Sequence, residues 1–243
     1  MSGAAAGVGA GAKADVDALA FEFELPGGGR ALFTTRAAGN LSTLAGAGHE
    51  HGLRRRRELC ERLRLRWLCS SRQAHGTTVH AIERLAGSGG QAVPIDADGH
   101  ATALHHVGAM VLAADCLPVA LGSDGAVAVV HAGWRGLAAG VLEQGVEALR
   151  TLSTGSGDIG AVVGPGAGAC CYEVGPEVHA AFAGAHAHGR NIDLRAIAHA
   201  RLATAGVTDV RDVRACTVCD PRFFSHRREG ARAGRQAGVA WLS

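Results

Sequence analysis

Three observations on the sequence predict a mixed α/β protein. Short runs such as Met110–Ala114 and Ala126–Val130 are aliphatic and bounded by turn residues, which is typical of buried strands. Other segments repeat apolar residues at helical spacing. The 243 residues are 47% hydrophobic and 19% charged, a composition that describes a globular protein of one large domain or two small ones.

The N-terminal segments predict a tail, a hairpin and a helix. Met1–Val16 is a Gly/Ala-rich series without the basic and apolar regions of a signal peptide, so we expect a disordered tail. Leu19–Glu24 alternates like a half-buried strand, and Arg30–Thr34 returns after a Pro-Gly turn as its partner. Leucines at roughly helical spacing then predict a helix over His49–Trp67.

Two strands in the middle of the chain each lead to a residue that can ligate a metal or act in nucleophilic catalysis. Met110–Ala114 leads to Cys116, and Ala126–Val130 leads to His131. The segment Leu121–Gly125 contains Asp-Gly, a strong turn signal, so we expect the two strands to lie close together. In an antiparallel pair these two ends would lie at opposite edges, so the pattern alone does not join the two side chains.

The C-terminal half alternates helices with strands. The predicted elements are a helix from about Ala132 to Leu152, a strand over Ile159–Val163, a helix from Gly175 through Phe182, a helix over Ile192–Ala205 and a strand over Val207–Val213.

Charge and cysteine content narrow the classes of partner and compartment. A net charge of +2 is too small to predict nucleic acid or an anionic membrane as a partner, and no run approaches the ~18 apolar residues of a membrane span. Seven cysteines without a secretory leader predict reduced thiols in the cytoplasm. Cys216-x-x-Cys219 has no second pair and no helix directly after it, so we interpret it as two loop cysteines outside the chemistry.

A set of motifs, in order and with characteristic spacing, resembles the YfiH-type family, whose members are also called laccase-domain polyphenol oxidases, peptidoglycan editing factors and purine nucleoside phosphorylases. The motifs are Gln73-x-His75-Gly76, Asp98 with Thr102, Ala114–Pro118, His131–Gly136, Gly164-Pro165 with Cys171–Gly175, and Phe223–Ser225 through Arg227-Arg228 to Gly234-Arg235. The resemblance spans roughly Phe33 to Leu242. It departs from the family pattern at Leu44–Arg57, which is shorter and more arginine-rich, at Ala74 and at His226.

The resemblance implies a layered α/β/β/α fold with mixed sheets and helices outside two packed sheets, in a single catalytic domain over residues 17–243. It also implies one zinc ion held by His75, Cys116 and His131, which would be the catalytic residues. Two imidazoles and one thiolate leave the fourth tetrahedral position open, which is the catalytic pattern of zinc.

The reaction implied by the resemblance is phosphorolysis of adenosine, inosine, guanosine and S-methyl-5′-thioadenosine, with adenosine deamination as a second activity. The partners would be a small nucleoside and phosphate. Phosphate requires cations, and the N–H groups at the start of a helix after His131 favour an anion. The candidate substrate-binding and phosphate-binding residues are Arg36, Gln73, Asp115, Arg135, Arg227 and Arg228.

Two other functions use the same residues. A metal-independent hydrolase or amidase acting on cell-wall precursors would use Cys116 as nucleophile and His131 as base. A polyphenol oxidase would need copper, but a multicopper site requires many His-x-His pairs, and His49-x-His51 and His186-x-His188 lie in or beside Gly/Ala-rich loops, so we interpret them as coincidental.

Overall fold

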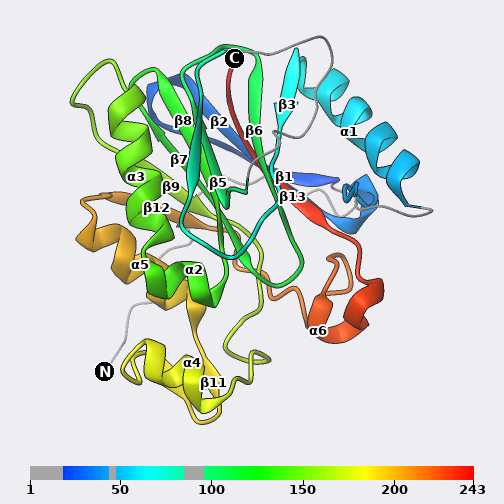
Figure 1. The fold of residues 1–243 in the computed structure, drawn as a ribbon, viewed down its shortest axis with the longest axis vertical. Helices are drawn as coiled ribbons and strands as arrows, with labels where there is room; N and C mark the ends of the chain where they lie inside the picture. The colour runs from blue at the N-terminus through cyan, green and yellow to red at the C-terminus, as the bar shows by residue number, and fades with distance from the viewer. Residues whose placement is uncertain (1–18, 44–47, 85–95) are drawn as a thin grey trace, which may run out of the picture.

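The computed structural model describes residues 19–43, 48–84 and 96–243. Two β-sheets pack face to face between two layers of helices (Figure 1). This confirms the expected α/β/β/α layering with mixed sheets. The expected tail over residues 1–16 lies outside the described residues.

The larger sheet has six strands and carries the residues of most interest. In spatial order they are β12 (Asp209–Asp212), β9 (Gly160–Val163), β7 (Leu117–Ser123), β8 (Ala126–Ala132), β5 (Gly99–Thr102) and β4 (Val79–Ile82). The two edge pairs, β12 with β9 and β4 with β5, are parallel, and the inner pairs are antiparallel. The sheet is therefore mixed.

The second sheet has five strands. In spatial order they are β1 (Ala20–Glu24), β2 (Gly29–Thr34), β13 (Gln236–Leu242), β6 (Val107–Ala113) and β3 (Trp67–Cys69). β1 and β2 form the predicted N-terminal hairpin. A separate two-stranded ribbon joins β10 (Ala187–His188) to β11 (Asn191–Ile192).

Helices cover the outer face of each sheet. The six α-helices of the described residues are α1 (His49–Leu63), α2 (Trp134–Ala139), α3 (Val141–Leu152), α4 (Pro176–Ala181), α5 (Leu194–Thr204) and α6 (His226–Glu229). α1 packs on the five-stranded sheet, and α2, α3 and α5 pack on the six-stranded sheet. Within the described ranges, no helix is both long and apolar enough to cross a membrane.

The central strand β8 explains why its sequence is a continuous run of apolar residues. Its Val127 and Val129 side chains join the core between the two sheets, whereas Ala128 and Val130 join the core under the helices. Every residue of β8 is buried. A strand covered on both faces has no polar positions to alternate with, so the period-2 pattern disappears.

Two predicted helices have different bounds in the structure. The helix expected over His49–Trp67 ends at Leu63, because Arg64 adopts a left-handed conformation (φ 55°) and caps it, and Trp67 begins β3 in the core between the sheets. The helix expected from about Ala132 to Leu152 is divided into α2 and α3 at Gly140 (φ 97°), where glycine accommodates the positive φ.

The two central apolar runs are not hydrogen-bonded partners. β6 belongs to the five-stranded sheet and β8 to the six-stranded sheet, where β8 pairs with β5 and β7. The sequence analysis did not predict β7. The Asp124-Gly125 turn joins β7 to β8, so the start of β7 lies opposite the end of β8. Cys116 immediately precedes β7, and His131 lies across from Pro118. The antiparallel pairing therefore brings these two residues to the same edge.

Candidate active site

His75, Cys116 and His131 converge at this edge of the six-stranded sheet. Their ligand atoms all lie within 4.8 Å of one another. The Nε2 atom of His75 is 3.9 Å from the Cys116 sulfur, and the two imidazole rings meet edge to face with centroids 4.8 Å apart. The structure therefore brings together all three residues that the sequence resemblance proposed as metal ligands.

The Asp98 carboxylate organises both histidines. Its Oδ2 atom accepts hydrogen bonds from the backbone N–H groups of Ala74 (3.0 Å) and Gly76 (2.7 Å), and its Oδ1 atom accepts from His75 N (3.0 Å). Oδ1 also lies 2.9 Å from Nδ1 of His131, and both side chains are buried. With Nδ1 bound in this way, His131 offers its Nε2 atom to the centre, as metal-ligating histidines usually do.

Local backbone geometry keeps space open for the three ligands. His75 has a positive φ of 61°, uncommon for a residue with a side chain, and the Asp98 carboxylate holds this loop through three N–H groups. Gly133 is the N-cap residue of α2 and lies next to two of the ligands. A Cβ at Gly133 would lie 3.0 Å from both the Cys116 sulfur and His75 Cδ2, so only glycine leaves both side chains undisturbed.

The charges at the centre favour a cation. Burial raises the pKa of the Cys116 thiol, but His131 and His75 outweigh burial and lower that pKa to about 6. Burial lowers the pKa of His131, but Cys116 and Asp98 outweigh burial and raise it to about 9. Cys116 is therefore a thiolate at neutral pH, which is the form of cysteine that ligates metals, and metal binding would displace the His131 proton.

The donor set fits a metal ion. Two imidazoles and a thiolate suit zinc with one open coordination position, and the same set is found in copper sites. In zinc sites, a carboxylate frequently forms a hydrogen bond with the imidazole nitrogen that does not bind the metal. Asp98 supplies that carboxylate and was absent from the predicted site residues; its signal in the sequence was the Asp98–Thr102 motif alone.

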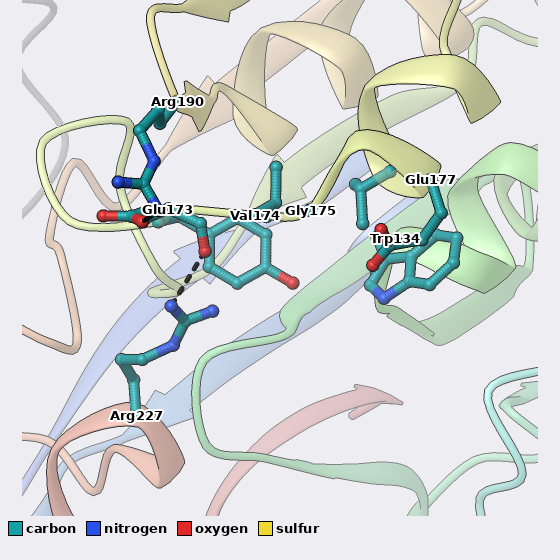
Figure 2. Close-up of a pocket in the computed structure, with 9 residues that line it drawn as sticks. Trp134, Glu173, Val174, Gly175, Glu177, Arg190 and Arg227 are labelled. Atoms are coloured by element: carbon teal, nitrogen blue, oxygen red, sulfur yellow. Dashed lines mark hydrogen bonds and ion pairs between the residues drawn. The ribbon is translucent and has the colours of Figure 1, made fainter.

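A pocket of about 350 Å³ lies near the centre, and its lining contains none of the three ligands themselves. Figure 2 shows Arg190 and Arg227 at one end of it and Trp134 and Glu177 at the other. Trp134 follows Gly133 directly, and burial together with the nearby Cys116 charge raises the pKa of the pocket residue Tyr172 to about 12. The volume of the pocket lies in the range that is usual for small-molecule binding sites.

Two of the predicted arginines lie at or beside this pocket. Arg227 donates a hydrogen bond from Nη1 to the Glu173 carbonyl (2.8 Å; Figure 2). Its guanidinium group also lies over the Tyr172 ring, 5.2 Å from the ring centroid. Arg135 is exposed on α2 and lies 4.3 Å from the centroid of the Trp134 ring. Arg190 also lines the pocket, where it forms an ion pair with Glu173. It was not among the residues predicted from the sequence.

The polar groups of Gln73 and Asp115 are occupied by protein contacts. The Gln73 amide forms two hydrogen bonds with the backbone of Leu112 in β6, which fixes the loop that leads to His75. Asp115 has a positive φ of 91°, and its carboxylate accepts hydrogen bonds from the Thr217 hydroxyl (2.6 Å) and Arg227 N (2.7 Å). These contacts hold the chain on either side of the metal ligands.

Arg36 and Arg228 lie outside the pocket lining and bind backbone carbonyls. Arg36 donates to the carbonyls of residues 221 and 223 and pairs with Glu229. Arg228 donates to the carbonyls of Thr217 and Val218 and pairs with the same Glu229. The structure does not bring these two predicted phosphate ligands to the metal centre.

Comparison with known proteins is informative over nearly the whole chain. A family model described as multi-copper polyphenol oxidoreductase laccase matches residues 30–243. The chain belongs to this laccase-like family. Crystal structures of YfiH-type relatives share the fold: a Neisseria meningitidis protein has a TM-score of 0.74 at 32% identity over 90% of this chain and 96% of its own, and a Bacillus licheniformis YfiH protein has 0.79 at 23% identity over 94% and 98%.

Curated relatives of this laccase-like protein carry another name. A Xylella fastidiosa protein named purine nucleoside phosphorylase is 41% identical over 237 residues, which cover 89% of this chain and 88% of its own. A Pseudomonas aeruginosa protein with the same activity in its name is 38% identical over 204 residues, covering 77% and 78%.

The residues described for this laccase-like chain contain two further groups of metal-ligating side chains. One joins Cys69, His80 and His100 and lies largely in the interior; the other joins Cys170 and Cys171 to Cys216 and Cys219. Cys216-x-x-Cys219 therefore lies beside a second pair of cysteines, and the expectation that it has no such pair was wrong. Neither His-x-His pair takes part in any of the groups found among the described residues.

Replacing Asp98 with asparagine is expected to weaken metal binding by about 10- to 100-fold, the usual effect of losing the carboxylate behind a histidine ligand. The single side-chain oxygen of asparagine can still accept the hydrogen bonds from the N–H groups of Ala74 and Gly76, so the fold should persist. Its NH2 group cannot accept from His75 N–H, and His131 loses its charged partner. Competition with a chromophoric zinc chelator measures the affinity. Unchanged affinity would contradict the organising role of Asp98.

Proposed function

We propose that this protein is a zinc-dependent purine nucleoside phosphorylase acting on adenosine, inosine, guanosine and S-methyl-5′-thioadenosine, with adenosine deaminase as a second activity. The observation that carries the proposal is a pocket that combines aromatic rings and arginines and that lies near the His75, Cys116 and His131 centre, with Trp134 and Tyr172 in its lining. The relatives named purine nucleoside phosphorylase, at up to 41% identity, support it.

The pocket provides chemistry for both halves of the substrate. A purine ring can stack on Trp134 or Tyr172, whose faces attract flat aromatic groups. A phosphate dianion requires charge-assisted donors, and Arg227 uses only one of its five N–H groups in the contact with Glu173. Glu173 is paired with Arg190, which offsets a carboxylate that would repel phosphate. We therefore place phosphate at the Arg227 end and the base toward Trp134.

Phosphorolysis requires a phosphate oxygen to attack C1′ of the ribose while the bond from C1′ to the purine nitrogen breaks and the base leaves with the bonding electrons and a proton. Zinc, when bound by His75, Cys116 and His131, supplies a Lewis acid with one open position. Asp98 holds His131 in a fixed orientation. The pocket arginines would hold phosphate beside the reacting carbon. Deamination needs water at the purine ring and no phosphate.

Product analysis with adenosine in the presence and absence of phosphate tests this proposal, using protein purified without added metal and analysed for zinc. We expect adenine and ribose 1-phosphate only when phosphate is present, and inosine in both conditions. A wild-type protein that releases the base equally well without phosphate would show that the phosphorylase assignment is wrong.

A metal-independent hydrolase or amidase acting on cell-wall precursors is the second candidate. The imidazole of His131 lies between the thiol of Cys116 and the carboxylate of Asp98. This arrangement favours the second candidate, because cysteine hydrolases place a thiol, an imidazole and an orienting group in the same way. This candidate predicts full hydrolytic activity in protein stripped of metal, where the phosphorylase should be inactive.

A copper-dependent polyphenol oxidase is the third candidate, favoured by the family description and by a donor set that copper also accepts. Copper-loaded protein should then oxidise a phenol at a rate that zinc-loaded protein does not reach.

A further inference from the structure

Four cysteine side chains from two loops converge at one point. Cys170 and Cys171 lie in the loop that follows β9, and Cys216 and Cys219 lie between β12 and α6. All four sulfur atoms lie within 4.8 Å of one another, with Cys219 2.9 Å from Cys171 and 3.5 Å from Cys170. The two pairs are more than 40 residues apart in sequence, so the fold, not local chain geometry, brings them together.

Backbone contacts hold the two loops in this arrangement independently of the thiols. The N–H of Thr217 donates to the Gly166 carbonyl (3.0 Å), and the N–H of Gly166 donates to the Ala215 carbonyl (3.4 Å). The Cys216 sulfur accepts a hydrogen bond from the N–H of Gly168 at 3.2 Å, and backbone N–H groups of its own turn also point at it. Backbone donors on a sulfur stabilise the thiolate form, which is the form that binds metals.

We propose that Cys170, Cys171, Cys216 and Cys219 bind a second zinc ion, in a closed structural site. Four thiolates in tetrahedral geometry, with Zn–S of about 2.3 Å, have sulfur atoms about 3.8 Å apart. Two of the separations, 2.9 and 3.5 Å, are shorter than that value, and all four sulfur atoms lie within 4.8 Å of one another, so small side-chain movements complete the site. The C-x-x-C spacing of the second pair is usual for structural zinc, and four ligands leave no open position for substrate.

A disulfide between Cys171 and Cys219 is the competing chemistry. It would engage two of the thiols and leave Cys170 and Cys216 beside it, and it would give no role to the N–H group aimed at Cys216. A metal ion engages all four sulfurs. Softness and geometry narrow the metal to zinc or iron, since tetrahedral sites with four sulfur ligands hold one of these.

The position of this cluster gives the ion a structural task. The first loop continues directly into Tyr172 and Glu173 of the pocket wall. The second contains Thr217, whose hydroxyl binds Asp115, the neighbour of Cys116. A zinc ion that joins the two loops would therefore fix the pocket wall relative to the first metal centre.

Metal analysis of the full chain tests the second site without depending on the proposed phosphorylase activity. Purified wild-type protein should contain two zinc ions per chain, and Cys216→Ser/Cys219→Ser should contain one. His75→Ala/Cys116→Ala should also contain one. Cys60→Ser, which changes a half-buried cysteine on α1 outside the cluster, is the matched control and should keep two.

Cobalt substitution of the wild-type protein keeps the test valid if the double variant fails to fold. Cobalt bound by four thiolates gives intense sulfur-to-metal absorption, and mass spectrometry of the same sample counts free thiols. One metal per chain together with a mass two hydrogens lower would establish the disulfide and overturn the proposal. Iron in place of zinc, or two zinc ions retained in Cys216→Ser/Cys219→Ser, would overturn it as well.

Discussion

Changing Cys116 to alanine should remove zinc from the centre that it shares with His75 and His131 and should abolish turnover of adenosine. The change removes the only anionic ligand of three, and the remaining imidazoles are too few to hold the ion. The loss of zinc affinity should exceed the roughly 10- to 100-fold effect of an outer carboxylate such as Asp98. Zinc content and product formation, measured on the same preparation, check both parts.

The matched control for this change is Cys60→Ser, because Cys60 is a half-buried cysteine on the opposite layer of the fold. It should keep the metal and the activity. Loss of activity in Cys116→Ala alone would also fit a thiol nucleophile, so metal-stripped wild-type protein is the deciding sample. Full activity in that sample would refute the zinc mechanism and favour the cysteine hydrolase.

The sequence predicted most of the strands and helices but not how the central strands pair. β1, β2, β9 and α5 follow from alternation, apolar runs and helix-ending residues. β7 was missed because Pro118 and Gly122 are residues that strands usually avoid, and the end of β7 reads as part of a turn. Pairing between β7 and β8 is decided by the whole sheet, and this pairing is what brings Cys116 beside His131.

The functional side chains were also predicted only in part from the sequence. Motifs pointed to His75, Cys116 and His131, but they did not show that Asp98 binds the loop of one histidine and the ring of the other. The four-cysteine cluster depends on a contact between residues 166 and 216, which no local pattern reveals. Residue type alone also does not identify the partner of an arginine. Arg228 was predicted to bind phosphate, but its guanidinium group donates hydrogen bonds to backbone carbonyls.

Changing Arg227 to alanine should suppress phosphorolysis about 10- to 100-fold more than deamination. The side chain lines the pocket over Tyr172, where it can supply charge-assisted hydrogen bonds to phosphate, and each such bond contributes about 1.5–3 kcal/mol. Deamination consumes water instead of phosphate and does not need this charge. The variant keeps its backbone N–H bond to Asp115, so the link to the metal centre persists. Ribose 1-phosphate and inosine are measured in parallel.

Two neighbouring arginines separate charge from structure in this test. Arg135 lies on Trp134, at the end of the pocket where we place the base, so Arg135→Ala should reduce phosphorolysis and deamination to a similar extent. Arg228→Ala removes hydrogen bonds to the loop of Thr217 and Val218 and should lower both activities equally, together with the unfolding temperature. An equal loss of both activities in Arg227→Ala would mean that this arginine shapes the pocket through Glu173, and phosphate would then have to bind elsewhere.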